Sequence, residues 1–508
     1  MKHGDYRREY AAYRTACERV RYDFLSGAVA KPDFAPLAER YFDLWTREAV
    51  ADLARAYAET PEQFETERAA LRTLAQAARL GYAQARAGEA AAELAHCEAA
   101  VRFEWDGARR GSREVAALIA NESDTSRRRE LVVRWLDEIR ICDDLHAARF
   151  EALSEAARSF DCDNYFALLS GAQRDSDAEN LLVSADVLLR QTEDVYNEHL
   201  SGWATRFLPP TATRELTYAE SLFFHQLPHL EKFFPARDLV ATYRDTLAGL
   251  GIRIEQQTNL QLEEISHRDV GSSAKCCALS PPKDVRLLYH ARSGAHLYQD
   301  FFHEAGRAQH FAWASRELAA RYPELIRPPS ITTGEASAFL FRFLLCDAAW
   351  IGERRGVKTA EARAIARAFA LVELYEARRN CAVLTYEDEL ARSTDPRFEQ
   401  LAATYETSLT EATGFHHPTA VRWFGVDEQS ITAADEFRAR LFAAALREYL
   451  RTRYGHRWWD SRKAGDELID LWNTASRYTL EELASLTGVG ALDVELLADA
   501  LSGVLRED

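Results

Sequence analysis

The chain has 508 residues, 47% of them hydrophobic, so it is long enough to bury one large core or several smaller ones. It contains 63 Lys and Arg against 80 Asp and Glu, which gives a net charge of −17 with no basic block. This balance argues against nucleic acid and anionic membranes as partners. Short peptides and small molecules remain as candidate ligands.

The cysteines and the first residues point to a compartment. The eight cysteines are scattered without C-x-x-C spacing, so we expect neither a disulfide framework nor a cysteine zinc site. The opening MKHGDYRREYAAYR is charged and lacks the apolar core of a signal peptide, and no uncharged apolar stretch of about 18 residues follows. These features predict a soluble, unexported protein of the reducing cytoplasm.

Helical periodicity dominates residues 1–250. Apolar residues recur at three- and four-residue spacing in segments such as residues 36–57 and 112–140, where we expect amphipathic helices. Turn signals near residues 210, 281, 325 and 415 are brief, and no internal repeat is visible. We therefore expect one compact body without a linker, made of a helical half (1–250) and a catalytic-like half (251–508).

Residues 252–291 are the exception to this helical pattern. The runs IRIEQQTNLQLEEIS, KCCALS and DVRLLYH alternate or stay apolar over strand lengths, between Gly, Pro and Ser breaks. They predict a small sheet. From Leu297 the helical period returns and continues to the C-terminus.

The first helix after the predicted sheet carries the segment FFHEAGRAQHFAW. His303 and Glu304 begin an H-E-x-x-H motif, in which two histidines four residues apart bind zinc and the glutamate activates a metal-bound water. Arg307 stands where the second histidine belongs. A guanidinium has no lone pair to donate, so the sequence predicts weak zinc binding at most. His296 and His310 lie about 10.5 Å from His303 along the helix axis, too far to share its ion.

The order of small sheet, H-E-A-G helix and the glutamate-bearing segment TTGEASAFLFRFLL resembles the thimet oligopeptidase and oligoendopeptidase F family of zinc metallopeptidases, the gluzincin type. The resemblance is strongest over residues 250–508. It implies a mainly α, bowl-shaped fold with a deep central channel and a small β-sheet beside the active-site helix. It also implies that Glu335 is a zinc ligand together with His303, and that Glu304 is the general base.

Four further residues are relevant to the site: two depart from the family pattern, and two lie in a predicted loop near the expected channel. Arg342 lies where the family usually has a carboxylate, and Ile431 aligns with a tyrosine that steadies the tetrahedral intermediate. Such a donor is commonly worth about 10²–10³ in rate. His416 and His417 precede Pro418 in a predicted loop near the channel, so we take these two histidines and Arg342 as candidate substrate-binding residues.

Three functions fit these residues. The chain could be a pseudoenzyme that binds a peptide or small ligand without zinc-dependent hydrolysis, or a metal-dependent oligopeptidase that uses Glu304 as base with His303 and Glu335 as ligands. It could also be a repurposed, metal-independent enzyme that uses Glu304 and Arg307 as an acid/base and anion-binding pair. In the first case we expect Arg307 to form a buried ion pair with Glu304 or Glu335 at the vacated metal position.

Overall fold

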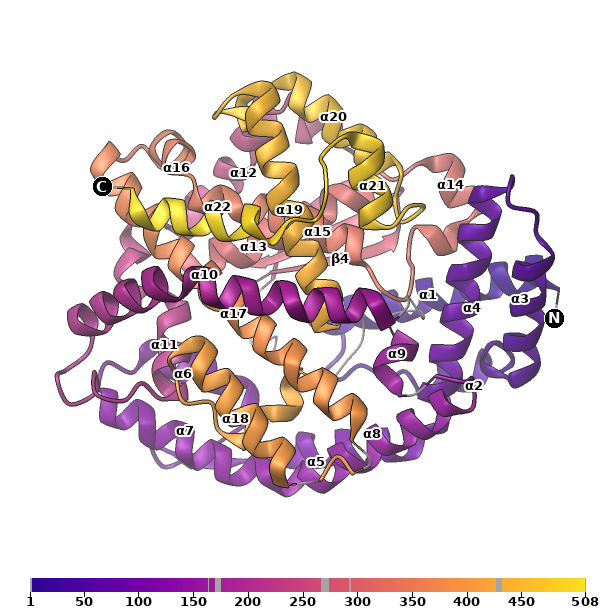
Figure 1. The fold of residues 1–508 in the computed structure, drawn as a ribbon, viewed down its shortest axis with the longest axis horizontal. Coiled ribbons are helices and arrows are strands. Elements are labelled where there is room, and N and C mark those ends of the chain that lie inside the picture. The colour runs from indigo at the N-terminus through magenta and orange to yellow at the C-terminus, as the bar shows by residue number, and fades with distance from the viewer. Residues whose placement is uncertain are drawn as a thin grey trace. The chain divides into compact units, whose positions relative to one another are not determined.

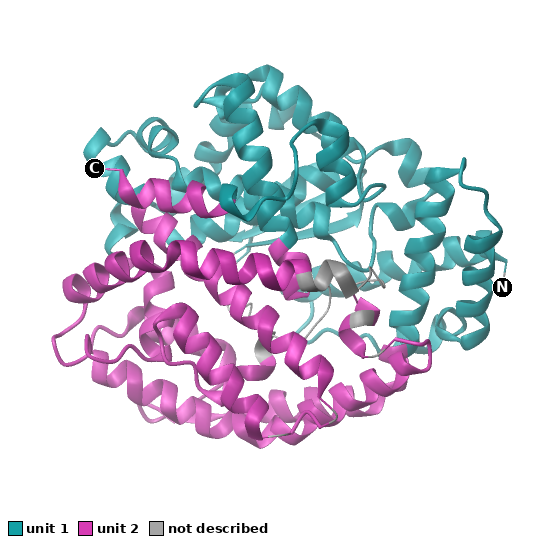
Figure 2. Ribbon diagram, viewed as in Figure 1, with its two compact units in different colours: residues 1–82, 229–366, 438–496 teal, residues 83–228, 367–437, 497–508 magenta. Residues whose placement is uncertain are grey.

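The computed structural model describes residues 2–162, 164–169, 175–265, 274–291, 294–393, 395–397, 399–425 and 432–507. Helices dominate these residues (Figure 1), as the sequence predicts. The chain divides into two compact units, and each unit combines segments that are distant in sequence (Figure 2). Unit one consists of Met1–Tyr82, His229–Ala366 and Arg438–Leu496, and unit two of Ala83–Pro228, Arg367–Phe437 and Leu497–Asp508. The sequence-based boundary at residue 250 stays a prediction.

Unit one is mainly helical, and its helices include the one that carries the H-E-A-G segment. They are α1 (His3–Leu25), α2 (Ala35–Arg40), α3 (Arg47–Glu59), α4 (Glu65–Arg86), α12 (Leu239–Gly249), α13 (Ala295–Ala312), α14 (Arg316–Arg321), α15 (Thr332–Arg342), α16 (Ala348–Arg355), α19 (Ala433–Tyr454), α20 (Arg462–Asn473) and α21 (Leu480–Thr487). Of these, α4 and α19 continue into unit two.

Unit two is also helical. Its helices are α5 (Gly88–Ala100), α6 (Val115–Asn121), α7 (Thr125–Ile139), α8 (Asp143–Arg158), α9 (Tyr165–Leu169), α10 (Asp175–Phe207), α11 (Tyr218–Gln226), most of α17 (Thr359–Arg392), α18 (Glu399–Thr413) and most of α22 (Val494–Arg506).

The predicted helical segments 36–57 and 112–140 each contain a helix start at a capping residue. A new helix, α3, begins after Thr46, whose hydroxyl accepts a hydrogen bond from the backbone N–H of Ala49 at 3.1 Å. Another, α7, begins after Asp124, whose carboxylate accepts from the N–H of Arg127 at 2.9 Å. Side chains of this kind satisfy the free N–H groups of a helix start, so they favour a new helix at these positions.

A short hairpin, β1 (Phe103–Trp105) and β2 (Ala108–Arg110), lies in a region predicted to be helical. Its turn residues Asp106 and Gly107 have φ angles of +51° and +70°. An Asp-Gly pair is the usual sequence of such a turn, so this signal was present in the sequence and outweighs the helical pattern around it.

The prediction that no disulfide forms is wrong for one pair. Cys97 of α5 and Cys142, just before α8, form a disulfide across a sequence separation of 45 residues. Spacing motifs detect only cysteines that are close in sequence, whereas packing of α5 against α8 brings this pair together. The cysteines therefore no longer support the predicted reducing compartment. Over the described residues, every helix is too short or too polar to span a bilayer.

The small sheet predicted between residues 252 and 291 is confirmed. It contains β3 (Leu260–Ile265), β4 (Ala274–Ser280) and β5 (Asp284–His290) in the order β3-β5-β4, with β3 parallel and β4 antiparallel to β5. Successive residues of a strand face opposite sides of the sheet. The side chain of Cys277 packs in the cluster that contains Leu25 of α1, and β4 also packs against α13. The sheet thus supports the helix that carries the motif.

The glycine of the H-E-A-G segment brings α13 and α15 together. A Cβ atom added to Gly306 would lie 2.2 Å from the carbonyl oxygen of Ser337, which is shorter than any real contact of this kind. Glycine is therefore required for the backbones to approach this closely. The close approach brings Glu335, in the first turn of α15, beside the motif residues of α13.

Candidate functional site

Four motif residues of α13 and α15 form one buried cluster in unit one. Nη1 of Arg307 donates hydrogen bonds to both carboxylate oxygens of Glu304, at 3.0 and 3.2 Å. Nη2 of Arg307 donates to Oε2 of Glu335. The other carboxylate oxygen of Glu335, Oε1, lies 2.9 Å from Nε2 of His303. The predicted ion pair is confirmed, and it includes both carboxylates.

Glu304 is held from a second direction by the sheet. Its Oε2 accepts a hydrogen bond from the backbone N–H of Cys276 at 3.1 Å, and its Oε1 lies 3.3 Å from Nζ of Lys275. Its side chain is only 4% exposed. The carboxylate is therefore enclosed by two cations and a backbone donor, which leaves little room for a water molecule to approach it.

The cations lower the pKa of both carboxylates. Burial alone raises the pKa of Glu304, but Arg307 and then Lys275 outweigh it and leave the pKa at about 2. Burial likewise raises the pKa of Glu335, but the charge of Arg307, together with the contact of His303, outweighs burial, so the pKa lies below the usual range. Burial lowers the pKa of Arg307, whereas Glu304 and Glu335 raise it by more. All three groups are ionised at neutral pH.

His303 is fixed by Glu335 and by an aromatic ring. Nε2 of His303 lies 2.9 Å from Oε1 of Glu335 and 3.3 Å from Nη2 of Arg307. Because a carboxylate only accepts, we assign the ring proton to Nε2. The ring meets that of Phe339 edge to face at 5.2 Å, and the guanidinium of Arg440 lies 4.1 Å from the Phe339 ring centroid. The histidine is thus held in one orientation.

The neighbouring histidines of α13 do not join the cluster. His296 pairs with Asp300 at 3.5 Å. His310 is fully buried, and both of its ring nitrogens lack a hydrogen-bond partner among the described residues. Burial, followed by the charge of Arg307, lowers its pKa to about 4, so the ring is neutral. This agrees with the spacing argument from the sequence.

The residues of the cluster do not fit a zinc ion. The resemblance assigns His303 and Glu335 as ligands, yet Nη2 of Arg307 already lies within hydrogen-bond distance of both. A guanidinium stays protonated and repels a cation, and two ligands are fewer than the three or four of protein zinc sites. Within the described segments, no three His, Cys, Asp or Glu side chains are grouped closely enough to hold a metal. We therefore derive no chemistry through a metal at this position.

The remaining candidate residues lie outside the cluster. Arg342 is in the last turn of α15, two helical turns or about 10.5 Å beyond Glu335. His416 and His417 belong to unit two: His416 pairs with Glu406 at 2.9 Å. His417 is buried against Tyr218 and Tyr375, and burial lowers its pKa to about 3. Its burial favours a packing role for His417 over the predicted role in substrate binding. The predicted departure at Ile431 lies outside the described residues.

Sequence reasoning missed three residues that shape the cluster. Lys275 comes from β4, and the only signal for it is a cation at the start of an otherwise apolar strand. Phe339 lies one helical turn after Glu335, where an apolar residue is unremarkable. Arg440 of α19 is distant in sequence, and nothing in its surroundings marks it.

No protein-family model and no curated protein matches the chain. Solved structures do match. The M32 carboxypeptidase from Deinococcus radiodurans R1 is 13% identical, with a TM-score of 0.63 and coverage of 99% of this chain and 97% of that chain. Trypanosoma cruzi metallocarboxypeptidase 1 is 13% identical, with a TM-score of 0.64 and coverage of 99% of both chains. A putative oligoendopeptidase F from Bacillus anthracis str. Ames is 11% identical, with a TM-score of 0.58 and coverage of 92% and 81%.

These likenesses establish the fold. The match to the carboxypeptidases extends over nearly the whole length of both chains, so it includes the helical first half that the sequence motifs did not cover. The predicted resemblance is confirmed at this level. The chain has the mainly α fold, with its small sheet, of M32 carboxypeptidases, oligoendopeptidase F and related zinc metallopeptidases.

Proposed function

We propose that this chain binds a short peptide, without zinc-dependent hydrolysis, on a metallopeptidase fold in which Arg307 has taken the place of the metal. The observation that carries the proposal is the guanidinium of Arg307, which contacts Glu304, Glu335 and His303 at once. The fold supports peptides as the ligand class, since the solved structures that share it are described as carboxypeptidases and oligoendopeptidases.

The low pKa of Glu304 and the ion pairs of Arg307 argue against both enzymatic alternatives, the metal-dependent oligopeptidase and the metal-independent enzyme. A general base works best when its pKa lies near the working pH. The pKa of Glu304 is about 2, so its carboxylate holds a proton poorly at neutral pH, and both of its oxygens already accept hydrogen bonds. Arg307 is similarly occupied by two carboxylates, which leaves little of its charge for a substrate anion.

Three measurements on the purified chain test the proposal. Metal content is measured after dialysis against a mild chelator, and a nonapeptide with fluorescein on its N-terminus is titrated by fluorescence anisotropy. The same mixtures, with and without added zinc chloride, are then followed by mass spectrometry. We expect zinc far below one per chain, saturable peptide binding and an intact peptide.

Three outcomes would overturn the proposal. Stoichiometric zinc that resists the chelator would favour a metal-dependent oligopeptidase instead. Peptide cleavage that is lost in Glu304→Gln would show that this carboxylate acts as a base. Absence of saturable binding across a set of nonapeptides of varied sequence would remove peptides as the ligand class.

A further inference from the structure

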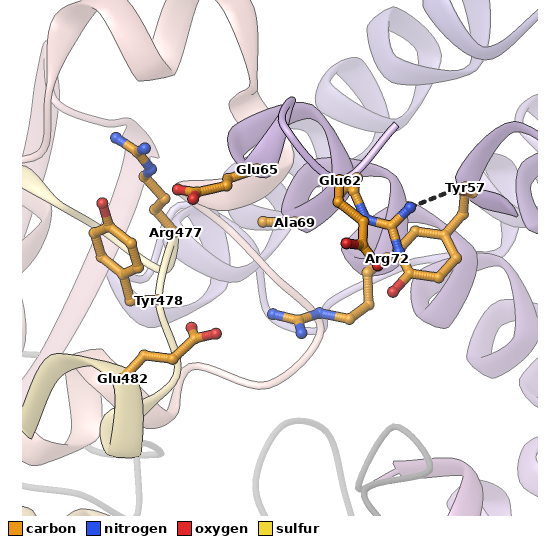
Figure 3. A pocket seen from close by; sticks show the side chains of 9 residues that line it. Tyr57, Glu62, Glu65, Ala69, Arg72, Arg477, Tyr478 and Glu482 are labelled. Carbon is orange, nitrogen blue, oxygen red and sulfur yellow. Dashed lines mark hydrogen bonds between the residues drawn. The ribbon is translucent and has the colours of Figure 1, made fainter. Parts of the chain in front are cut away.

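A polar pocket lies in unit one, and none of the motif residues lines it. Its volume is about 280 Å³, and it is lined by one face of α4, the end of α3, and the segment that joins α20 to α21 (Figure 3). The α4 residues Glu65, Arg68 and Arg72 recur at three- and four-residue spacing, so they point to the same side of the helix. The pocket is small for a ligand site and suits a molecule of few atoms.

The charges around this pocket are balanced but largely unpaired. Arg68, Arg72 and Arg477 face Glu62, Glu65 and Glu482, which gives three positive and three negative side chains. Among the residues that the structure describes, Arg72 and Arg477 form no ion pair, and neither do Glu62 and Glu65. Arg68 is engaged, because it donates to the carbonyl of Thr60 at 2.5 Å and lies over the Tyr57 ring. The guanidinium of Arg477 lies over the Tyr478 ring, 4.9 Å from its centroid, but it has no carboxylate partner among the described residues. The charges of Arg72 and Arg477 therefore remain available to a ligand.

The picture of the pocket shows how these groups are arranged. Arg72 extends from α4 into the space that separates this helix from Arg477, Tyr478 and Glu482 (Figure 3). One oxygen of Glu482 accepts from the backbone N–H of Thr479 at 2.8 Å, in the cap of α21, and this bond holds the carboxylate in place. Cations and carboxylates thus line one small space.

The segment that carries Arg477 is held rigidly. The backbone N–H of Ser476 donates to the carbonyl of Leu325 at 2.9 Å, and its hydroxyl lies 2.9 Å from that of Thr333 in α15. Ala475 has a φ of +50°, a left-handed conformation that is uncommon for alanine. The turn at Ala475 directs the chain so that Arg477 and Tyr478 line the pocket. A pre-organised wall lowers the entropy that a ligand loses on binding.

We infer that this pocket binds a small zwitterion, of the size of a free amino acid or a dipeptide. A carboxylate of the ligand would be recognised by Arg72 and Arg477, and its ammonium group by Glu65 or Glu482. A simple anion would meet the arginines but would be repelled by the three carboxylates. The net charge of −17 further disfavours anions in general, so both charges of a zwitterion are needed.

Isothermal titration calorimetry with alanyl-alanine tests the inference. N-acetyl-alanine, which lacks the ammonium group, and alaninamide, which lacks the carboxylate, are titrated in parallel. We expect each analogue to bind at least about tenfold more weakly than alanyl-alanine. We also expect Arg72→Ala and Arg477→Ala to raise the Kd for alanyl-alanine by at least about tenfold each.

A matched control is available on the same helix. Arg86 is an exposed residue in the last turn of α4 that does not line the pocket, so Arg86→Ala should leave the Kd unchanged. Circular dichroism of each variant checks its folding. If Arg477→Ala fails to fold, Arg477→Lys keeps the charge without the planar fork, and should still weaken binding.

Several results would overturn the inference. N-acetyl-alanine or inorganic phosphate binding as tightly as alanyl-alanine would show an anion site. Binding that Arg72→Ala and Arg477→Ala leave unchanged would place the dipeptide elsewhere, and no detectable binding of alanyl-alanine would remove the site. The fluorescein-labelled nonapeptide of the previous section has no free terminal amine. Failure of the nonapeptide titration and failure of the alanyl-alanine titration can therefore be distinguished.

Discussion

Replacing Arg307 by alanine should destabilise unit one strongly, because two buried carboxylates would lose their main counter-charge. The side chains of Glu304 and Glu335 are only 4% and 10% exposed, and Arg307 contacts both. Removing one partner of a buried pair typically costs about 3–5 kcal/mol. Lys275 remains beside Glu304, and the Arg307 side chain is 22% exposed, so we expect a loss toward the lower end, about 3 kcal/mol.

A double-mutant cycle separates this ion pair from simple loss of packing. Arg307→Ala combined with Glu335→Ala removes the cation together with one of the carboxylates that it neutralises. The double variant should therefore lose less stability than the sum of the two single variants, by roughly 1–3 kcal/mol. The natural chain, the two single variants and the double variant are unfolded in urea and followed by tryptophan fluorescence. Their free energies of unfolding can be compared if the four transitions have the same dependence on urea concentration.

An exposed pair on a neighbouring helix supplies the control. Arg321 and Glu317 of α14 lie 3.4 Å apart, with side chains that are 64% and 77% exposed. The same cycle on this pair should give a coupling below about 0.5 kcal/mol, since solvent screens it. Additive losses for Arg307 and Glu335, or a coupling no larger than that of the control pair, would refute the view that the guanidinium neutralises a buried carboxylate.

Three further outcomes follow from the same cluster. Arg307→His should take up zinc in calorimetric titrations, because it adds a second imidazole to the face that carries His303; no uptake would show that these side chains cannot converge on an ion. Gly306→Ala should lower the melting temperature by several degrees, since its methyl group would meet the Ser337 carbonyl. Because the pKa of Glu304 falls from 4.5 to about 2, its contribution to stability is present above pH 4.5 and is lost as the pH falls toward 2. Urea midpoints measured between pH 6 and 3 should therefore fall less steeply in Glu304→Gln.

The parts of the fold predicted from sequence are those with strong local signals. The apolar strand runs and the later return of helical period predict both the sheet and α13. The sheet and the helix are thus specified by neighbouring residues. The position of Glu335 came instead from the family resemblance, and the chemistry of a guanidinium predicted its ion pair with Arg307.

The parts that were not predicted depend on contacts between distant segments. The disulfide between Cys97 and Cys142 requires packing of α5 on α8, and no spacing rule encodes that packing. Lys275 and Arg440 reach the cluster from a strand and a distant helix, so their roles appear only once the elements are assembled. The β1–β2 hairpin was missed for another reason. Its Asp-Gly turn is a local signal in the sequence, but the prediction gave more weight to the helical periodicity around it.

Charge balance explains how the two buried carboxylates of the cluster are stabilised although its residues do not fit a metal. Arg307 and Lys275 supply two positive charges within 3.3 Å of the negative charges of Glu304 and Glu335. Zinc would bring the same charge of +2 as a single ion. The guanidinium also has five donors directed in a plane, which lets one side chain bind two carboxylates at once. Arg307→His removes one of these charges, so that variant should be less stable than the natural chain without zinc and should regain stability when zinc binds.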